Sequence, residues 1–460
     1  MGAADVALRR VASRDALPPA AQGEDSAAAG GKAEVHTDAK AEVNTLREPI
    51  GLAVRGPASR CQAPARGPSQ NLGAEDLEVQ RSGSATRAAP DGPRKGLLGF
   101  AGVLASSKVL SALLLCIPLG FLSNFQGWPM WAVFACNFFA VLPMAWLIGK
   151  STEDLAAHTG EAAGGLLNAT FGNVVEMLLC VQGIRRGEMA IVRYTLVGSI
   201  LSNMLLVLGT ALLWGGYKNP PPKTMKYSRT GAGAQGNLML ISVLGVALPT
   251  VYSMLSEGTG AVLDISRGCS VMLFSLYVQY LFFQLKTHKH VFEGPEGEHG
   301  EVECPDMDAY TAVAVLAACT ALTSCCADYL IGSIEGTIAS CSVSREFVGV
   351  VVLPIIGNAA EHFTAILVAG QNRMDLSLGV AVGSSCQVAL MVTPFTVFVG
   401  WAVGSPMSLD FGPFQVAVLL MAVLLVTSVL KDGESTWLDG SMLCTAYCAI
   451  ALMCFFGFSP

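Results

Sequence analysis

Residues 164–176 read GGLLNATFGNVVE, and residues 349–362 read GVVVLPIIGNAAEH. Each stretch places a Gly-Asn pair and a glutamate inside a long apolar segment; the glutamates are Glu176 and Glu361. A carboxylate at the depth of a lipid bilayer is energetically expensive, so its presence there indicates a functional role. Two carboxylates in matched settings predict a site.

The two stretches belong to an internal duplication. A shift of 185 positions, from Gly164 to Gly349, superimposes Gly, Asn, Glu and Ser residues in two successive apolar segments. The aligned pairs are Gly164/Gly349, Gly172/Gly357, Asn173/Asn358, Glu176/Glu361, Gly198/Gly383 and Ser199/Ser384. One offset that spans two segments is typical of transporter folds built from structural repeats.

The composition is that of a membrane protein. Hydrophobic residues make up 52% of the chain and charged residues 14%, whereas soluble domains carry about a quarter charged residues. Most of the fourteen cysteines lie inside apolar runs, where thiols behave as small hydrophobic groups rather than as a disulfide framework.

The hydropathy pattern predicts an all-α integral membrane protein. Residues 1–95 are polar, carry charges of both signs and have almost no aromatic residues, which predicts a disordered N-terminal tail. From Leu97 onward, apolar runs of near-spanning length recur. We place eleven spans, near residues 103–122, 129–149, 163–183, 190–215, 237–255, 263–285, 309–333, 346–370, 376–402, 412–430 and 437–457.

The basic loops predict the orientation. Lysine and arginine residues gather after the fourth span and after the sixth, so these loops, and with them the N-terminus, are expected in the cytosol. Arg185 and Arg186 lie on the other side of this scheme. The glutamate spans are the third and the eighth, an odd separation. They therefore cross the membrane in opposite directions, which makes the duplication inverted.

An acidic loop, residues 286–308, separates the sixth and seventh spans. It carries seven Asp or Glu residues within sixteen positions, from Glu293 to Asp308. Two interpretations stay open. The loop is either a solvated charged linker or a cytosolic segment whose field concentrates divalent cations near the mouth of the pathway.

The candidate ligands are all hard oxygen donors. They are the carboxylates of Glu176 and Glu361, the amide oxygens of Asn173 and Asn358, and backbone carbonyls freed near Gly172 and Gly357. Such a set suits calcium first and manganese next, and it requires no cofactor. Two facing carboxylates in a low dielectric cannot stay fully ionised when the metal leaves, so protons must replace it. The same carboxylates then hold either the metal or protons, which predicts proton–metal exchange.

The spans that follow the glutamates add polar residues. Ser199 and Ser384 are matched by the repeat, and with Gln387 they are candidates for the cation path. His362, beside Glu361, is either a hydrogen-bonded structural group or a proton relay. Asp264, Arg267 and Asp328 lie near span ends, where paired or interfacial positions are expected.

The motifs resemble those of a known family. GGLLNATFGNVVE followed by GSILSN, and GNAAEH followed by GSSCQ, are similar to the two signature repeats of the vacuolar-type calcium/proton exchangers, the CAX family of the cation/calcium exchanger superfamily. The resemblance covers about residues 97–460. One departure is GNVVE, where the family usually has a sequence such as GNATE; Val174 and Val175 could tighten the cavity.

The resemblance implies a specific organisation. A first transmembrane helix, residues 96–124, would precede two inverted five-helix repeats, residues 125–285 and 309–460. The protein would move cytosolic calcium into an acidic endomembrane compartment such as the vacuole, against proton flow. By motif, Glu176 and Glu361 become the ion and proton carriers. Their neighbours in the site become Asn173, Asn358, Ser199, Ser384 and Gln387.

Three alternatives remain. A manganese-preferring or sodium-coupled exchanger would use a similar site, and a cation channel would also use carboxylates. We find no HExxH, GxSxG or P-loop motif, so an enzyme is not expected. The expected partners are the lipid bilayer and the transported ions, with no nucleic acid; the sequence carries no signal for an oligomeric state.

Overall fold

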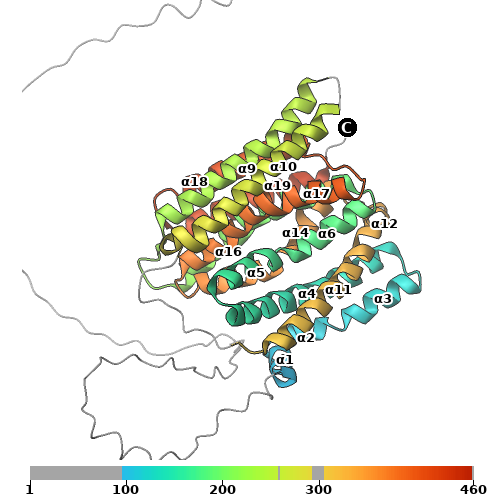
Figure 1. Cartoon of the computed structure of the whole chain (residues 1–460), viewed down its shortest axis with the longest axis horizontal. Coiled ribbons are helices and arrows are strands. Elements are labelled where there is room, and N and C mark those ends of the chain that lie inside the picture. The colour runs from blue at the N-terminus through green and yellow to red at the C-terminus, as the bar shows by residue number, and fades with distance from the viewer. Residues whose placement is uncertain (1–95, 257–259, 293–304, 458–460) are drawn as a thin grey trace, which may run out of the picture. The chain divides into compact units, whose positions relative to one another are not determined.

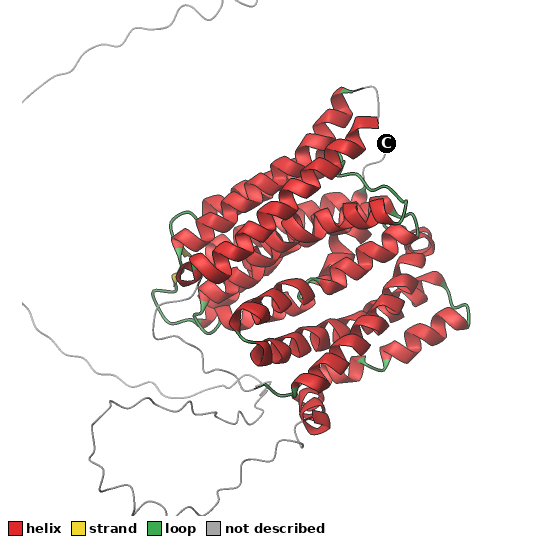
Figure 2. Cartoon of the chain, viewed as in Figure 1, coloured by secondary structure: helices red, strands yellow, loops and turns green. Residues whose placement is uncertain are grey.

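The protein is a bundle of helices (Figure 2). The structure, a computed structural model, describes residues 96–256, 260–292 and 305–457. The expected all-α fold class is confirmed. The only strands in these ranges, β1 (Met225–Lys226) and β2 (Glu434–Ser435), pair antiparallel and join two loops. The predicted tail, residues 1–95, and most of the acidic loop, residues 293–304, lie outside the described residues.

The first half of the chain contributes the elements up to the acidic loop. They are α1 (Gly96–Ser106), α2 (Lys108–Leu113), α3 (Cys116–Phe125), α4 (Met130–Thr159), α5 (Glu161–Phe171), α6 (Val174–Arg185), α7 (Met189–Leu201), η2 (Ser202–Val207), α8 (Leu208–Lys218), α9 (Arg229–Leu255), α10 (Gly260–Phe282), η3 (Phe283–Thr287) and η4 (Lys289–Val291).

The second half repeats much of this order. Its elements are α11 (Ala309–Gly332), α12 (Ile334–Cys341), α13 (Arg345–Phe347), η5 (Val348–Val352), α14 (Leu353–Gly357), α15 (Ala359–Ala369), α16 (Met374–Gln387), η6 (Val388–Val392), α17 (Thr393–Ala402), α18 (Pro413–Val429) and α19 (Trp437–Phe456).

The helices are long and apolar enough for a membrane. Among the described residues, eight helices pass this test by length and hydropathy, and two bent helix pairs pass it together. Pro413–Val429 is a shorter apolar helix. The chain is therefore an integral membrane protein, as expected. The count of eleven spans stays a prediction.

The first span differs from the single helix expected over residues 103–122. It consists of the short helices α1, α2 and α3, and the span-length segment begins only at Lys108. Proline has no N–H and its ring clashes with the carbonyl four residues earlier. Pro118 therefore interrupts the helix near Leu114, and Ser107, whose side chain accepts from the N–H of Leu110, separates α1 from α2.

Two apolar clusters organise the bundle. The buried side chains of α4 and α11 form one cluster with residues of α6 and α14. The buried side chains of α7, α8, α9 and α16 to α19 form the other. Figure 1 shows α4 and α11 side by side, with α5 and α6 between them and the remaining helices. The half-helices that carry the glutamates therefore lie near the boundary between the clusters.

The two halves of the chain touch closely at Gly198. This residue of α7 crosses the segment that leads into α14, and a Cβ there would lie 2.6 Å from Cγ of Pro354. Small residues allow such close approach of helices in membranes. At the repeat-matched Gly383, an added Cβ would lie 3.4 Å from Nε2 of Gln235, an ordinary contact.

We predict that Gly198→Ala destabilises the protein, whereas Gly383→Ala does not. Overpacking at a close backbone crossing costs about 1–3 kcal/mol, and only Gly198 meets backbone and a proline ring. The measurement is the melting temperature of each purified variant in the same detergent. Equal melting temperatures for the two variants would contradict the close crossing.

Candidate functional site

Two helices break at the two Gly-Asn pairs. The helix that begins as α5 bends by 45° before α6, and the helix that ends as α14 bends by 61° before α15. Asn173 precedes the first residue of α6, and Asn358 precedes the first residue of α15. Interrupted helices of this kind are where inverted-repeat carriers place their ions. The expected break in each repeat is therefore present.

Each glutamate lies in the first turn of its half-helix. Glu176 is the third residue of α6 and Glu361 the third residue of α15. The free N–H groups and the dipole of a helix N-terminus favour a negative charge there. The Glu176 carboxylate lies against Gly357, four residues before Glu361. The structure thus brings together two acidic groups from opposite halves of the chain.

Several buried oxygens at this place have no hydrogen-bond donor among the described residues. They are both carboxylate oxygens of Glu176, Oε2 of Glu361, and Oδ1 of Asn173 and of Asn203. Leaving a buried acceptor unpaired costs about 1–3 kcal/mol, and more when it is charged. Such a set of acceptors can be satisfied by a cation or by protons.

The amide side chains are held differently in the two halves. Asn173 donates to Oε1 of Gln387 over 2.5 Å, which leaves its own oxygen without a donor. Asn358 accepts from the Ser199 hydroxyl over 2.9 Å and donates to the Ser199 carbonyl over 3.1 Å. Predicted site residues that are far apart in the sequence therefore contact one another.

Ser384 has a partner that the sequence prediction did not include. Nδ2 of Asn203 donates to the Ser384 hydroxyl over 3.0 Å. Asn203 is fully buried. The signal that could have identified it is the asparagine of GSILSN, the only amide within the fourth predicted span.

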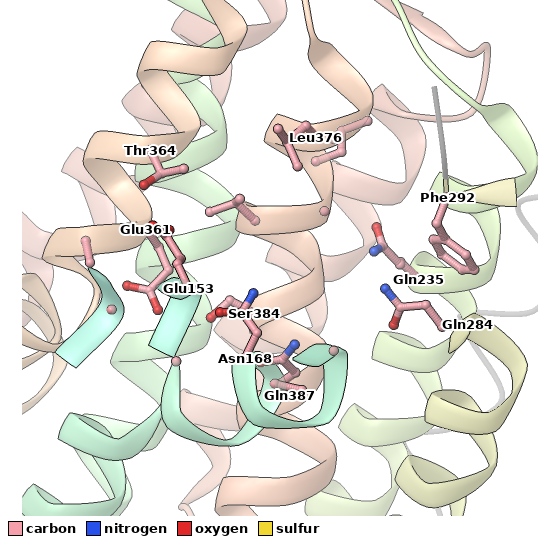
Figure 3. A pocket seen from close by; sticks show the side chains of 18 of the residues that line it. Glu153, Asn168, Gln235, Gln284, Phe292, Glu361, Thr364, Leu376, Ser384 and Gln387 are labelled. Atoms are coloured by element: carbon pink, nitrogen blue, oxygen red, sulfur yellow. The ribbon is translucent and has the colours of Figure 1, made fainter. Parts of the chain in front are cut away.

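A cavity of about 350 Å³ reaches the broken helices. Five predicted site residues line it: Gly172, Gly357, Glu361, Ser384 and Gln387. Figure 3 shows Glu361, Ser384 and Gln387 in this cavity. Glu176 is 2% exposed and is not among the described residues that line it. The Glu361 carboxylate is thus accessible from the cavity, whereas the Glu176 carboxylate is buried away from it.

The cavity extends toward one face of the bundle. Its lining includes Ser228, which precedes α9, and Val291 and Phe292, at the end of η4. We name the face that carries these segments the basic-loop face, after its basic residues Lys218, Lys223, Lys226, Arg229, Lys286 and Lys289. The predicted site therefore communicates with the basic-loop face in this conformation.

Sequence reasoning missed several polar residues of the cavity. They are Glu153, Asn168, Gln235 and Gln284, all labelled in Figure 3. Glu153 lies between the predicted spans 129–149 and 163–183, yet α4 continues to Thr159. Gln235 lies in the second turn of α9. In the sequence, only the polarity of this side chain within a helical stretch marks it as a candidate for the cavity lining.

His362 faces another helix. Its Nε2 lies 2.9 Å from the hydroxyl of Thr210 on α8, and it is not among the described residues that line the cavity. The interaction ties the second half-helix to the first repeat. Of the two interpretations of His362, this geometry favours the hydrogen-bonded structural group.

The charged groups near span ends are paired, as expected. Arg267 lies 3.1 Å from Asp264, and Arg186 contacts both carboxylate oxygens of Asp328 at 2.8 Å. The second pair joins the end of α6 to α11. It lies at the end of α6 away from the break, on the face opposite the basic-loop face.

Gly357 makes room for Glu176. A Cβ on Gly357 would lie 2.9 Å from Cδ of Glu176 and would meet its Oε1. At Gly379, which lines the same cavity, an added Cβ would have no heavy atom within 4 Å. The absence of a side chain at residue 357 is therefore what allows the carboxylate to lie against the opposite repeat.

We predict that Gly357→Ala weakens calcium binding by about tenfold or more, since the added methyl displaces the carboxylate and one lost charge-assisted contact is worth about 1.5–3 kcal/mol. Gly379→Ala is the matched control and should bind as the unmodified protein does. The measurement is equilibrium calcium binding to purified protein. Equal affinity of the two variants would show that Glu176 does not need the space at residue 357.

Comparison with known sequences identifies the family. The family described as sodium/calcium exchanger protein matches residues 129–286 and 311–456. The vacuolar calcium ion transporter of Schizosaccharomyces pombe is 38% identical over 78% of this chain and 87% of its own length. The Ca²⁺/H⁺ antiporter of Aphanothece halophytica is 37% identical over 77% of this chain and 98% of its own.

Solved structures agree with the sequences. Native YfkE superposes with a TM-score of 0.66 at 30% identity, over 75% of this chain and 99% of the other. A structure described as the H⁺/Ca²⁺ exchanger CAX shares the fold, with a TM-score of 0.59 at 15% identity, over 75% and 87% of the two chains. The chain belongs to the sodium/calcium exchanger protein family, in the branch of calcium/proton exchangers that its motifs resemble.

Proposed function

We propose that this protein is a secondary active antiporter that exchanges cytosolic calcium for protons. The observation that carries the proposal is the set of buried oxygens around Glu176 and Glu361 that have no donor among the described residues. A site of this kind is stable only when a cation or protons supply the missing positive partners. Because both ligands need the same oxygens, binding one displaces the other.

The donor set supports calcium as the substrate. Carboxylate and amide oxygens from Glu176, Glu361 and Asn173 are unpartnered, and calcium accepts such oxygens in flexible geometry. Gln387 orients the Asn173 amide, and Ser199 and Ser384 hold the neighbouring amides. The named relatives are calcium transporters and calcium/proton antiporters. Manganese, which takes similar ligands, is the competing substrate to be tested.

Contacts between helices support two inverted repeats. The offset of 185 relates α8 to α17, and the order of the elements relates α10 to α19. The contacts follow this relation: α10 packs on α17, and α19 packs on α8. Likewise α6 packs on α17, and its mate α15 packs on α8. We therefore assign residues 125–285 and 309–460 to the repeats and residues 96–124 to the additional first helix. Counting each bent pair and Pro413–Val429 as spans gives eleven crossings.

We place the protein in an acidic endomembrane such as the vacuole. The name of the relative from Schizosaccharomyces pombe, a vacuolar calcium ion transporter, supports this location. The basic-loop face would be cytosolic, together with the tail, residues 1–95, and the acidic loop, residues 286–308. The cavity would then receive calcium from the cytosol, and release would occur on the acidic side, where protons compete for the carboxylates.

The decisive experiment for the function is metal uptake into proteoliposomes under an imposed pH gradient. An acidic interior should drive calcium accumulation, and collapse of the gradient with an ionophore should abolish it. Manganese in place of calcium tests the substrate preference. Uptake driven by a sodium gradient, or uptake at the same rate without any gradient, would contradict the proposal.

We predict that Glu361→Gln and Glu176→Gln each abolish proton-driven calcium uptake while the protein stays folded. Each change removes one of two charges that balance a divalent ion, whereas amide and acid have nearly equal volume. A monodisperse elution profile and an unchanged melting temperature serve as the folding control. Substantial uptake by either variant would rule out the pair as the coupling site.

We predict that calcium affinity weakens as pH falls. Protonation neutralises the carboxylates that bind the ion, so mass action lowers the apparent affinity by at most about tenfold per pH unit for each proton displaced. Calcium binding measured over a pH series checks this, and an affinity independent of pH would refute proton competition.

His362→Ala separates the two interpretations of the histidine. A proton relay would change the pH dependence of the transport rate more than the affinity. Loss of the Thr210 contact alone would lower thermal stability and shift the rate equally at every pH. A large loss of calcium affinity would exclude the relay.

A further inference from the structure

The two halves of the site are in different states. On one side, the carboxylate of Glu176 lies against Gly357, and the Ser199 hydroxyl donates to Oδ1 of Asn358. These contacts join α6 and α7 of the first repeat to the helix break of the second. We name them the locked contacts. They leave Asn358 with both ends of its amide bonded.

The repeat-matched contacts are absent among the described residues. Gly172 has no atom of Glu361 within 4 Å of the position of an added Cβ. Oδ1 of Asn173, the mate of the bonded Asn358 oxygen, accepts no hydrogen bond. The Ser384 hydroxyl, the mate of Ser199, instead accepts from Asn203 and lines the cavity. The half of the site that lacks these contacts, around Asn173 and Glu361, is therefore the half that faces the cavity.

We propose that transport exchanges these two sets of contacts. In the conformation that opens to the opposite face, Ser384 donates to Asn173 and Glu361 lies against Gly172, while Ser199 and Glu176 release Asn358 and Gly357. The amide oxygen offered to the ion thus changes from Asn173 to Asn358 during the cycle. Ser199 and Ser384 act as positioning residues that decide which face the site serves.

The proposal rests on the proposed exchange function and follows from the duplication. Inverted repeats place the ion site at their interface and alternate access by moving against one another around it. Because the two repeats carry the same residues in opposite directions, a contact made by one repeat in this conformation can be made by the other repeat in the opposite conformation. Each residue of the locked contacts has an identical mate 185 positions away: Glu176/Glu361, Gly357/Gly172, Ser199/Ser384 and Asn358/Asn173. The same bonds are therefore available to both states.

The test measures calcium affinity at each face. Transport by right-side-out and inverted membrane vesicles gives KM for calcium at the basic-loop face and at the opposite face. We define the KM ratio as KM at the opposite face divided by KM at the basic-loop face. This ratio reports the balance between the two conformations, because the apparent affinity scales with the population that can bind. Loss of one hydrogen bond should shift this ratio about two- to tenfold.

Ser199→Ala removes a bond of the present conformation only, so the ratio should fall. In the present conformation the Ser384 hydroxyl also has a partner, Asn203. The effect of Ser384→Ala on the KM ratio is therefore measured in protein that already carries Asn203→Ala. In that background Ser384→Ala removes only the bond of the other conformation, and the ratio should rise. Ser385→Ala, whose hydroxyl donates within its own helix to Ala381, is the control and should leave the ratio unchanged.

Opposite shifts from the two serines, with the control unmoved, support the exchange of contacts. Shifts in the same direction, or no shift from either serine, overturn it. Proton-driven uptake by the unmodified protein is measured in the same vesicles. If the unmodified protein shows no such uptake, the proposed function itself fails, whereas normal uptake with unmoved ratios refutes only the exchange of contacts.

Discussion

The pair of buried carboxylates, Glu176 and Glu361, is the constraint on which the rest of the site depends. Two like charges in a low dielectric repel each other and lose their hydration. The helix N-termini that follow the two breaks offset part of this cost, because each glutamate lies in a first turn. The remainder must come from a bound cation or from protons, since the described residues leave the carboxylate oxygens without enough donors.

The surrounding helices give the two carboxylates different access to the cavity. Glu361 faces a cavity that leads to the basic-loop face, whereas Glu176 is sealed against Gly357. On the opposite face, the Arg186–Asp328 pair joins α6 to α11. The site lies near the boundary between the two apolar clusters, so relative movement of the clusters would open one side of the site as it closes the other. A channel would need both sides open at once.

The sequence was sufficient for the fold class, the broken helices and the pair of glutamates, because each depends on local hydropathy or on the offset of 185. It could not reveal the difference between the halves: Ser199 and Ser384 are the same residue, and only packing decides that one bonds Asn358 and the other Asn203. Glu153 was missed because α4 extends beyond its apolar run. The break in the first span depends on Pro118, whose effect hydropathy does not register.

The most direct test of the shared site is the number of protons released when calcium binds to the purified protein in detergent, measured by titration calorimetry in buffers of different ionisation enthalpy. If the same carboxylates hold both ions, each calcium ion should release about one or two protons. This number should fall when the solution pH is high enough to empty the site of protons beforehand. Calcium binding with no proton release at any pH would contradict the account.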